Sequence, residues 1–459
     1  MDSLKTLLKG MTLSTTRSAP EPPNPNRPTG LLDLPPELID MIASYLETDW
    51  IGDFELEQFH EVCRYIYQAT FYQFCRRKFE TIRVDFSVAS WRHINRIINR
   101  PDIAPHVKAL NIYTSRNSNS PLCFGGGVEW PRSRGGRLNT KSKAVTRWHD
   151  AFAKLPNLSS FTIRRPFNDF SPDETDAESD DDEYGPLTLT DLHVLMMSVF
   201  ATGRVKVEAY KLAWHQIGGV GFRTLRSLEM KYIDTASSSS HLRHPSFIQA
   251  WANIRSFSYD AAIASTAEAA YLIQLLKLAP NLESLYFNFD RDEEYAPAVI
   301  DSLADESEEG FGFRLKSLKF KNTGFHSPSV LPAILRRHRL SLERLVLEEI
   351  SFEGDGITRL LAVSKEFEKA GLPALTYFFF NAIRDKGGDN IQGPYRGLIV
   401  PKYGKKTVKK MDKETPGDFC YFLNGFLFPG TSYLRYEGPQ ANFVLRQLRH
   451  IAGYSLRRW

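Results

Sequence analysis

The chain has 459 residues, of which 42% are hydrophobic and 24% charged, and its formal net charge is +4. This composition is typical of a soluble intracellular protein that can bury a large core. No run approaches the roughly 18 apolar residues needed to cross a bilayer. Four cysteines without C-x-x-C spacing are too sparse for a disulfide framework or a zinc site: Cys63, Cys75, Cys123 and Cys420. We therefore expect a reducing compartment, cytoplasmic and/or nuclear, with no metal, no cofactor and no membrane contact.

Residues 1–30 form a leader in which five prolines lie between Pro20 and Pro28. Such a stretch cannot form a core, so we predict a disordered, Pro-rich leader. The segment Met1–Ala19 lacks the apolar core of a signal peptide. Its basic residues leave a mitochondrial presequence open as an alternative.

Two short helices are predicted after the leader. Pro35 and Pro36 suit a first helical turn, where a backbone N–H would have no partner within the helix. The apolar residues that follow fall on one side of that helix: Leu38, Met41, Ile42, Tyr45 and Leu46. A second helix is predicted by apolar residues at three- and four-residue spacing: Leu56, Phe59, Val62, Cys63 and Ile66. Helices of about ten residues are marginal alone, so each needs a neighbour.

The Pro-rich leader, the Leu34-Pro35 start and the later Val62-Cys63-Arg64 together resemble the F-box family. This resemblance implies that residues 31–80 form a helical module that binds the small adaptor of a ubiquitin ligase. The residues that would bind the adaptor are Leu34, Pro35, Leu38, Ile42, Leu46, Val62 and Cys63. One departure is Thr48–Asp53, where the family more often has leucines. An ordinary buried helical hairpin remains the alternative.

The rest of the chain repeats an apolar pattern at positions i, i+3 and i+5. Positions i+3 and i+5 share one face of a strand, whereas the three do not share one face of a helix. We therefore predict strands at Val107, Leu110, Ile112; Leu158, Phe161, Ile163; Val207, Tyr210, Leu212; Leu225, Leu228, Met230; Ile254, Phe257, Tyr259; Leu282, Leu285, Phe287; Leu315, Leu318, Phe320; Leu342, Leu345, Leu347; and Leu375, Phe378, Phe380. From Leu225 onward the first anchors recur at a near-regular interval, which overlaps the upper end of leucine-rich-repeat periods.

Helix signals lie between these strands. Ser265–Glu268 is a capping box before an apolar run, and two further signals include Ile334 with Leu335 and Ile357 with Leu360 and Leu361. A unit of one strand and one helix cannot cover its own apolar face, so successive units must stack. The predicted fold class is an α/β repeat: the helical module, then an irregular solenoid over residues 81–385 with parallel strands inside and helices outside.

This arm resembles the degenerate leucine-rich-repeat substrate arms of fungal-type F-box proteins. Two departures stand out. The asparagine expected at the third position after the last anchor is absent, so we predict no asparagine ladder. The earlier first anchors, at Val107, Leu158, Val207 and Leu225, are spaced unevenly, which indicates insertions or a misphased repeat in this part of the chain.

Charged residues are segregated into loops. Asp173–Glu183 holds eight acids in eleven residues, so we predict a disordered acidic loop at 171–186. Within it, Ser179 precedes three aspartates and is a candidate phosphorylation site. A basic Gly/Lys loop is predicted at 386–416, and the aromatic segment 417–459 is predicted to cap the solenoid. A second basic loop contains Arg132, Arg134, Arg137, Lys141 and Lys143.

No enzyme signature is found: the chain has no G-x-S-x-G, P-loop or H-E-x-x-H motif. Gly125–Gly127 lacks the strand and the acidic partner of a nucleotide site. His149 and Asp150 are adjacent and should point to different sides of a helix, which disfavours a catalytic pair. The basic loops lack the interleaved aromatics of a nucleic-acid reader, so no nucleic-acid partner is expected.

No enzyme motif opposes a non-catalytic role, and the resemblance to the F-box family implies the substrate-recognition subunit of an SCF-type ubiquitin ligase. Its expected partners are the ligase adaptor, a cullin through that adaptor, and an unknown protein substrate on the repeat arm. Two alternatives stay open. One is a repeat scaffold for protein interactions without ligase association, and the other is a hydrolase with an unrecognised site.

Overall fold

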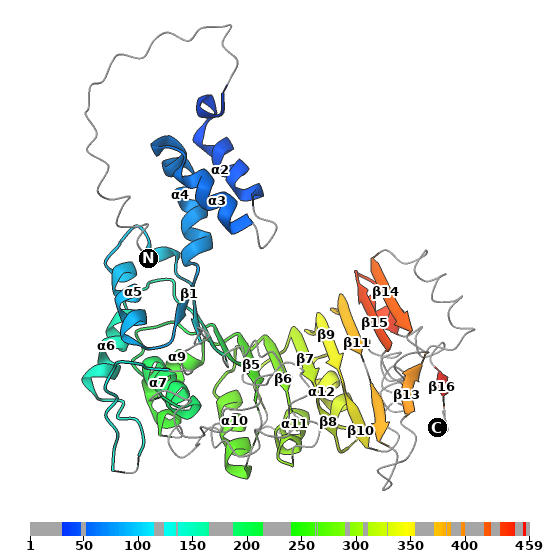
Figure 1. Ribbon diagram of the computed structural model, residues 1–459. Helices are drawn as coiled ribbons and strands as arrows, with labels where there is room; N and C mark the ends of the chain where they lie inside the picture. The colour runs from blue at the N-terminus through cyan, green and yellow to red at the C-terminus, as the bar shows by residue number, and fades with distance from the viewer. Residues whose placement is uncertain are drawn as a thin grey trace, which may run out of the picture. The chain divides into compact units, whose positions relative to one another are not determined.

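The computed structural model of the chain divides into two compact units, residues 1–77 and 78–459, which we call the helical unit and the sheet unit (Figure 1). The structure describes residues 30–46, 52–113, 124–134, 136–164, 187–213, 240–261, 263, 265–289, 294–305, 311–327, 329–353, 371–381, 383–386, 396–399, 417–423, 432–445 and 453–455. The predicted acidic loop, with Ser179, and nearly all of the predicted leader lie outside these residues.

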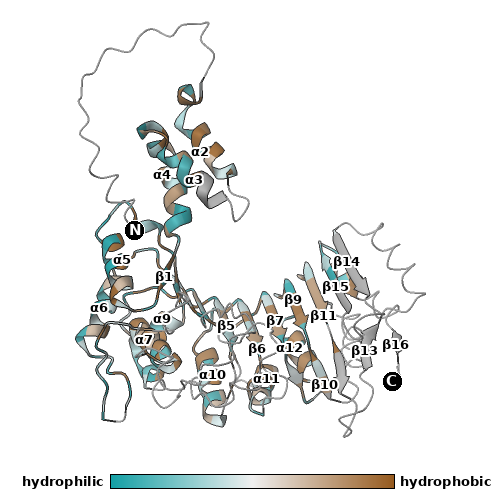
Figure 2. Cartoon of the chain, viewed as in Figure 1, coloured by the Kyte–Doolittle hydropathy of each residue, from teal (hydrophilic) through white to brown (hydrophobic). Residues whose placement is uncertain are grey.

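The helical unit begins with a short 3-10 turn, η1 (Leu31–Asp33), followed by the helix α2 (Pro36–Tyr45). Pro35 is the N-cap residue of α2 and Pro36 its first residue, which confirms the predicted helix start. The helix is amphipathic, and hydrophobic residues in brown mark much of it in Figure 2. It packs inward through Ile39 and Ala43, which are fully buried.

The prediction of a single second helix was wrong. Two helices occupy this stretch, α3 (Gly52–Glu61) and α4 (Arg64–Phe79), and Val62 and Cys63 lie between them. Val62 is 63% exposed rather than packed on the first helix. The apolar spacing misled because the buried side of α3 contains Leu56 and, four positions later, a polar residue. A pattern of apolar residues alone does not include that position.

That polar residue is His60, which is 3% exposed. Its ring stacks on Phe74 with a centroid distance of 4.1 Å, and its Nδ1 lies 2.8 Å from the Thr70 hydroxyl oxygen. Thr70 donates its only hydroxyl proton to the Ile66 carbonyl, so His60 must donate to Thr70 from Nδ1. Burial lowers the pKa of His60. A neutral, hydrogen-bonded histidine therefore joins α3 to α4.

The sheet unit contains an 11-stranded sheet, and the first nine of its strands are parallel and follow chain order. In sheet order the strands are β1 (Thr81–Val84), β2 (Ala109–Ile112), β3 (Ser160–Arg164), β4 (Ala209–Ala213), β5 (Ser256–Asp260), β6 (Ser284–Asn288), β7 (Ser317–Lys321), β9 (Arg344–Glu348), β11 (Tyr377–Asn381), β15 (Ser432–Glu437) and β14 (Asp418–Leu423). The last two run antiparallel to their neighbours. The α/β part of the predicted fold, with a mostly parallel sheet, is confirmed.

Helices connect the strands and lie along one face of the sheet (Figure 1). They are α5 (Val88–Ile98), α6 (Lys143–Phe152), α7 (Leu189–Ala201), α9 (Pro245–Trp251), α10 (Thr266–Lys277), α11 (Ala296–Ala304) and α12 (Val330–His338), with 3-10 turns η2 (Ala104–His106) and η5 (His241–Arg243). The predicted helix start at Ser265 is confirmed, because its side chain accepts from the Glu268 N–H. The signal at Ile357 lies outside the described residues.

The strand register follows the predicted anchors. Leu110, Phe161, Tyr210, Phe257, Leu285, Leu318, Leu345 and Phe378 occupy one continuous row across β2 to β11. All of them are 0–2% exposed. The middle anchors of eight predicted strands are therefore aligned in the core.

One predicted strand is not among the described strands of this sheet. β4 pairs directly with β5, with Tyr210 opposite Phe257, so no strand separates them. The triplet at Leu225, Leu228 and Met230 lies outside the described residues. The first anchors of β4 and β5, Val207 and Ile254, lie farther apart in sequence than those of any two later neighbouring strands, so the chain carries a long insertion there.

A second sheet was not predicted. Its order is β16 (Gly453–Ser455), β13 (Arg396–Ile399), β12 (Arg384–Lys386), β10 (Ser351–Glu353) and β8 (Gly324–Phe325). The predicted basic loop 386–416 thus contains a strand, β13. The C-terminal segment contributes two strands, β14 and β15, to the first sheet and one, β16, to the second. The pattern of period-two anchors missed β8 and β10 because each is only two or three residues long.

A short chain of side-chain hydrogen bonds crosses the ends of three repeats. The Asn288 amide donates to Asp260 at 2.7 Å, and the Asn322 amide donates to Asn288 at 2.9 Å. Asn322 has a positive φ of 49°, which asparagine tolerates better than most residues. Amide side chains therefore link neighbouring repeats, at Asn288 and Asn322 rather than at the third position after the last anchor.

A buried histidine also joins neighbouring repeats. His193 of α7 lies 2.6 Å from the Tyr210 hydroxyl through Nδ1 and 2.8 Å from the Tyr271 hydroxyl through Nε2. A neutral imidazole donates through one nitrogen and accepts through the other, so both tyrosines are satisfied. Burial lowers the pKa of His193 to about 3.

This burial predicts a pH dependence of stability. His193 binds a proton near pH 6.5 in the unfolded chain and only near pH 3 in the folded chain. Its stabilisation is therefore complete above pH 6.5 and is lost as the pH falls toward 3. Replacing His193 by Asn should lower the slope of unfolding free energy against pH in that window by up to about 1.4 kcal/mol per pH unit. Urea titrations between pH 7 and 4 measure this slope.

The matched control is His244→Asn, since His244 is already exposed in the folded chain. If the His193 and His244 variants give the same slope, the buried neutral state of His193 is refuted.

Candidate functional site

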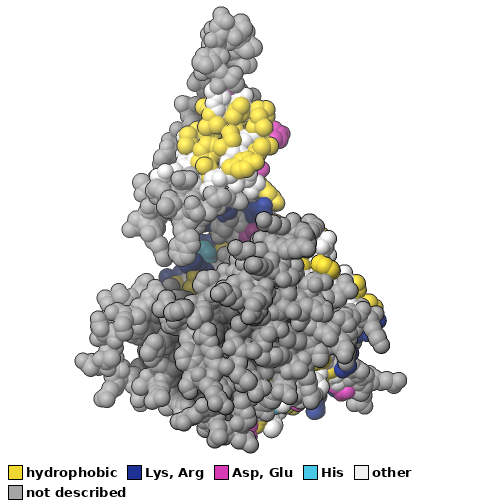
Figure 3. Space-filling view, turned by 90° about the vertical axis from the view of Figure 1, so that its right-hand side faces the viewer, with side chains coloured by type: hydrophobic (Ala, Val, Ile, Leu, Met, Phe, Trp, Pro, Cys, Tyr) yellow, Lys and Arg dark blue, Asp and Glu magenta, His cyan; other side chains and the backbone are white. Residues whose placement is uncertain are grey.

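Exposed apolar side chains are concentrated in the helical unit. Among the described residues, twelve large apolar side chains are exposed, and only Ile248, Leu340 and Phe443 belong to the sheet unit. The other nine are Leu31, Leu32, Leu38, Met41, Tyr45, Val62, Tyr65, Tyr67 and Tyr72. Figure 3 shows hydrophobic side chains in yellow gathered on one face of this unit. A unit of this small size rarely leaves such a surface to water unless a partner covers it.

The helix α2 has two apolar sides with different environments. Ile39 and Ala43 face the interior, whereas Leu38, Met41 and Tyr45 are 41%, 52% and 76% exposed. These three follow each other at i, i+3 and i+7, so they form one stripe along the helix. Packing inside the unit therefore does not account for the exposed stripe.

The start of α2 is held in place from α4. The Tyr65 hydroxyl donates to the Leu34 carbonyl at 2.7 Å, and the Gln73 amide donates to the Asp40 carboxylate at 3.1 Å. These bonds tie both the Leu34-Pro35 segment and the first turns of the helix to one neighbour. The exposed stripe is consequently presented by a fixed helix.

The adaptor-binding residues expected from the sequence have mixed environments. Pro35, Leu38 and Val62 are exposed, while the remaining four are half-buried: Leu34, Ile42, Leu46 and Cys63. Sequence reasoning missed the tyrosines of α4. Tyr65 and Tyr72 are seven residues apart and so lie on one helical face, a spacing that could have indicated them.

The second face of the sheet, opposite its buried core, carries polar and aromatic side chains. We call it the polar face. Strand residues alternate between the two faces, so the positions between the buried anchors belong to it. One row across adjacent strands is Ser284, Ser317, Arg344 and Tyr377, and the next row is Tyr286, Lys319, Val346, Phe379 and Arg435.

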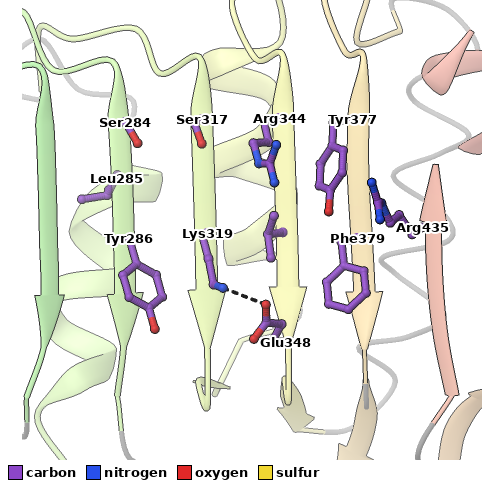
Figure 4. Close-up of a pocket in the computed structure, with 11 residues that line it drawn as sticks. Ser284, Leu285, Tyr286, Ser317, Lys319, Arg344, Glu348, Tyr377, Phe379 and Arg435 are labelled. Atoms are coloured by element: carbon purple, nitrogen blue, oxygen red, sulfur yellow. Dashed lines mark hydrogen bonds and ion pairs between the residues drawn. The ribbon is translucent and has the colours of Figure 1, made fainter. Parts of the chain in front are cut away.

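These two rows line a hollow of about 330 Å³ (Figure 4). Lys319 bonds Glu348 at 2.7 Å, and Lys321 approaches the same carboxylate at 3.8 Å. The Arg344 guanidinium lies 3.8 Å from the centroid of the Tyr377 ring. Glu348 therefore pairs with both lysines but offsets the charge of only one of them, while Arg344 is oriented by an aromatic ring.

Burial, and then the nearby carboxylates of Asp260 and Glu348, raise the pKa of Tyr286. Its hydroxyl is consequently a proton donor at any physiological pH. Figure 4 shows the Tyr286 and Tyr377 side chains on the same side of the strands as Arg344. The hollow thus offers hydroxyl and guanidinium donors beside aromatic rings.

The adjacent His149 and Asp150 do not form a catalytic pair. His149 lies 3.0 Å from the Ser198 hydroxyl oxygen, whereas Asp150 accepts from Arg204 at 2.8 Å. Ser198 donates its proton to the Leu195 carbonyl at 2.7 Å, so His149 donates to Ser198 instead of activating it. This geometry opposes the use of Ser198 as a nucleophile.

Other expected features have structural roles or fall outside the described residues. In the second basic loop, Arg132 forms an ion pair with Asp191 at 2.6 Å, and Asp191 caps α7. Gly125 has a φ of 78° and packs against Trp130, which a side chain would displace. The lysines of the 386–416 loop are not described.

Within the described residues, no group of three or more His, Cys, Asp or Glu side chains is placed to hold a metal ion. The described helices include none long and apolar enough to span a membrane. Comparison with protein-family models and with curated proteins finds no match to this chain. The exposed helical surface and the polar face are therefore the two features that bear on function.

The exposure of α2 predicts two different responses to substitution. Ile39→Ala should destabilise the helical unit by about 2–5 kcal/mol, because it removes fully buried methyl groups. Met41→Ala should change stability by no more than about 0.5 kcal/mol, because its side chain is already in water. Hydrogen exchange of the α2 amides reports both values. Equal costs for the two variants would show that Met41 is packed and would contradict an open stripe.

Proposed function

We propose that this chain is the substrate-recognition subunit of an SCF-type ubiquitin ligase. The observation that carries the proposal is the concentration of exposed apolar side chains on the helical unit. Leu38, Met41 and Tyr45 would be covered by the ligase adaptor, with Leu34 and Pro35 at one end of the contact. An amphipathic helix that leaves one apolar side open is suited to docking in a groove of a partner.

The resemblance of Leu34-Pro35 and Val62-Cys63-Arg64 to the F-box family agrees with this assignment. The bond from Tyr65 to Leu34 gives the motif a physical role, since it fixes the chain just before α2. A preformed docking surface loses less conformational entropy on binding than a mobile one. We therefore assign the helical unit as an F-box-like module.

The sheet unit is proposed to be the substrate arm, as a leucine-rich-repeat-like solenoid. Nine parallel strands that follow chain order, with helices along one face, support this assignment. So does the near-regular spacing of the first anchors of β5, β6, β7, β9 and β11, which are Ile254, Leu282, Leu315, Leu342 and Leu375. The polar face is the surface that such an arm would offer to a substrate.

In this proposal the chain contributes no chemistry of its own. The helical unit binds the adaptor, and through it a cullin and the ubiquitin-conjugating enzyme. The sheet unit binds the substrate, so that a substrate lysine is held near the activated ubiquitin. The gain in rate then comes from effective concentration.

The test is binding of the purified chain to the ligase adaptor, measured by calorimetry. Wild type should bind, and Leu38→Glu/Met41→Glu should lose at least about a hundredfold in affinity, because two charges would be buried without partners. Circular dichroism must show that the variant is folded. Leu340→Glu is the matched control, since Leu340 is 70% exposed but belongs to the sheet unit.

A folded wild type that does not bind the adaptor would overturn the ligase assignment. The remaining hypothesis would then be a repeat scaffold for protein interactions. Loss of binding in the Leu340 variant as well would show that the effect of added charge is not specific to the stripe on α2.

A further inference from the structure

The polar face carries a row of hydrogen-bond donors that are not bonded to neighbouring described side chains. Ser284, Ser317, Arg344 and Tyr377 lie in register on four adjacent strands. Among the described residues, none of these four side chains has a hydrogen bond to another side chain, and Arg344 has no carboxylate partner. Four strands about 4.8 Å apart span about 14 Å, which is the length of about four extended residues. The row can therefore follow a short extended peptide.

Aromatic side chains lie along this row of donors. The Tyr377 ring lies between two guanidinium groups, with Arg344 at 3.8 Å and Arg435 at 5.7 Å from its centroid. On the next strands Lys319 lies 5.1 Å from the Tyr286 ring. Stacking on a ring fixes the plane of a guanidinium while its N–H groups stay able to bind an anion.

The charge of the polar face is asymmetric. The strand positions of this face with described side chains include seven cations, Arg83, Arg164, Lys211, Lys319, Lys321, Arg344 and Arg435, and three carboxylates, Asp260, Glu348 and Glu437. At the hollow, Glu348 is occupied by Lys319 and Lys321, and Glu437 by Arg435. Among the described cations at the hollow, Arg344 is thus the one without a carboxylate partner.

We propose that the polar face between β6 and β15 binds a short acidic segment of a protein substrate. One carboxylate or phosphate of that segment is bound by Arg344, and a neighbouring apolar side chain enters the hollow beside Tyr286, Val346 and Phe379. This inference rests on the proposed function, because it names the class of substrate for the same arm. Charge complementarity identifies the occupant as acidic, and the hollow identifies it as a peptide with at least one apolar residue.

A peptide fits this face better than a nucleic acid does. Glu348 lines the hollow and Glu437 lies opposite Tyr377 in the strand register, so both would repel a continuous phosphate backbone. A peptide can instead place its acids only where the cations are. Val346 is 5% exposed at the centre of the hollow and favours an apolar side chain. A peptide with isolated acidic residues next to an apolar residue therefore matches the separated cations and the apolar hollow.

The experiment is fluorescence anisotropy with the full chain and four labelled probes. The first is a ten-residue peptide of Asp and Glu around one central Leu, and the second replaces every acid by its amide. The third is the acidic peptide with one phosphoserine, and the fourth is a single-stranded RNA of ten nucleotides. The acidic peptide should bind, the amide peptide should bind at least about tenfold more weakly, and added salt should weaken binding. A preference for the third probe over the first would identify phosphate as the anion.

Two variants separate a direct contact from general electrostatics. Arg344→Glu should weaken the acidic peptides by at least about tenfold. Arg164→Glu makes the same change of charge on the same face, on β3, outside the hollow, and should change affinity by less than about threefold. Both side chains are exposed, so both variants should fold.

Equal effects of the two variants, equal binding of acidic and amide peptides, tighter binding of the RNA, or no binding of either acidic peptide would overturn the inference. Binding of the adaptor to the Arg344→Glu variant is measured as well, so that the ligase assignment and the substrate class are tested separately. If the adaptor binds and the peptides do not, only the substrate class fails. If the peptides bind and the adaptor does not, the ligase assignment fails.

Discussion

The register of the parallel strands is the constraint on which the sheet unit depends. One row of buried side chains runs from Leu110 to Phe378, and each member lies opposite the next across the hydrogen-bonded strands. Because side chains alternate between faces, a slip of one residue would bury polar residues such as Lys319 and expose Leu318. The buried row therefore also determines the polar face, and with it the positions of Arg344 and Tyr377.

Much of this sheet could be predicted from the sequence, because strands with one buried face leave a period-two pattern. That pattern located eight described strands, and a separate capping-box signal located the helix start at Ser265. The predicted strand at Leu225 lies outside the described residues and stays a prediction. The period-two pattern missed the second sheet, whose short strands pair through backbone atoms, and the amide bonds between Asp260, Asn288 and Asn322.

Less of the helical unit could be predicted from the sequence. The start of α2 at Pro36 could be predicted from the sequence. The packing of the interior could not, because His60 is buried through a hydrogen bond and a stacked ring rather than through hydrophobicity. The apolar pattern of α2 also could not say which side faces inward. Ile39 and Ala43 are buried, and Leu38, Met41 and Tyr45 are left exposed. The two units thus differ in what they offer: an apolar helical surface in one, and a cationic, aromatic sheet surface in the other.

Hydroxyl-radical footprinting with and without the ligase adaptor tests the central claim most directly, since it reads the exposure of individual side chains. Met41 and Tyr45 should be strongly labelled in the free chain and protected by the adaptor. Tyr286 and Tyr377 should be labelled equally in both states, because they belong to the surface assigned to the substrate. Unchanged labelling of Met41 and Tyr45 at saturating adaptor would contradict the account.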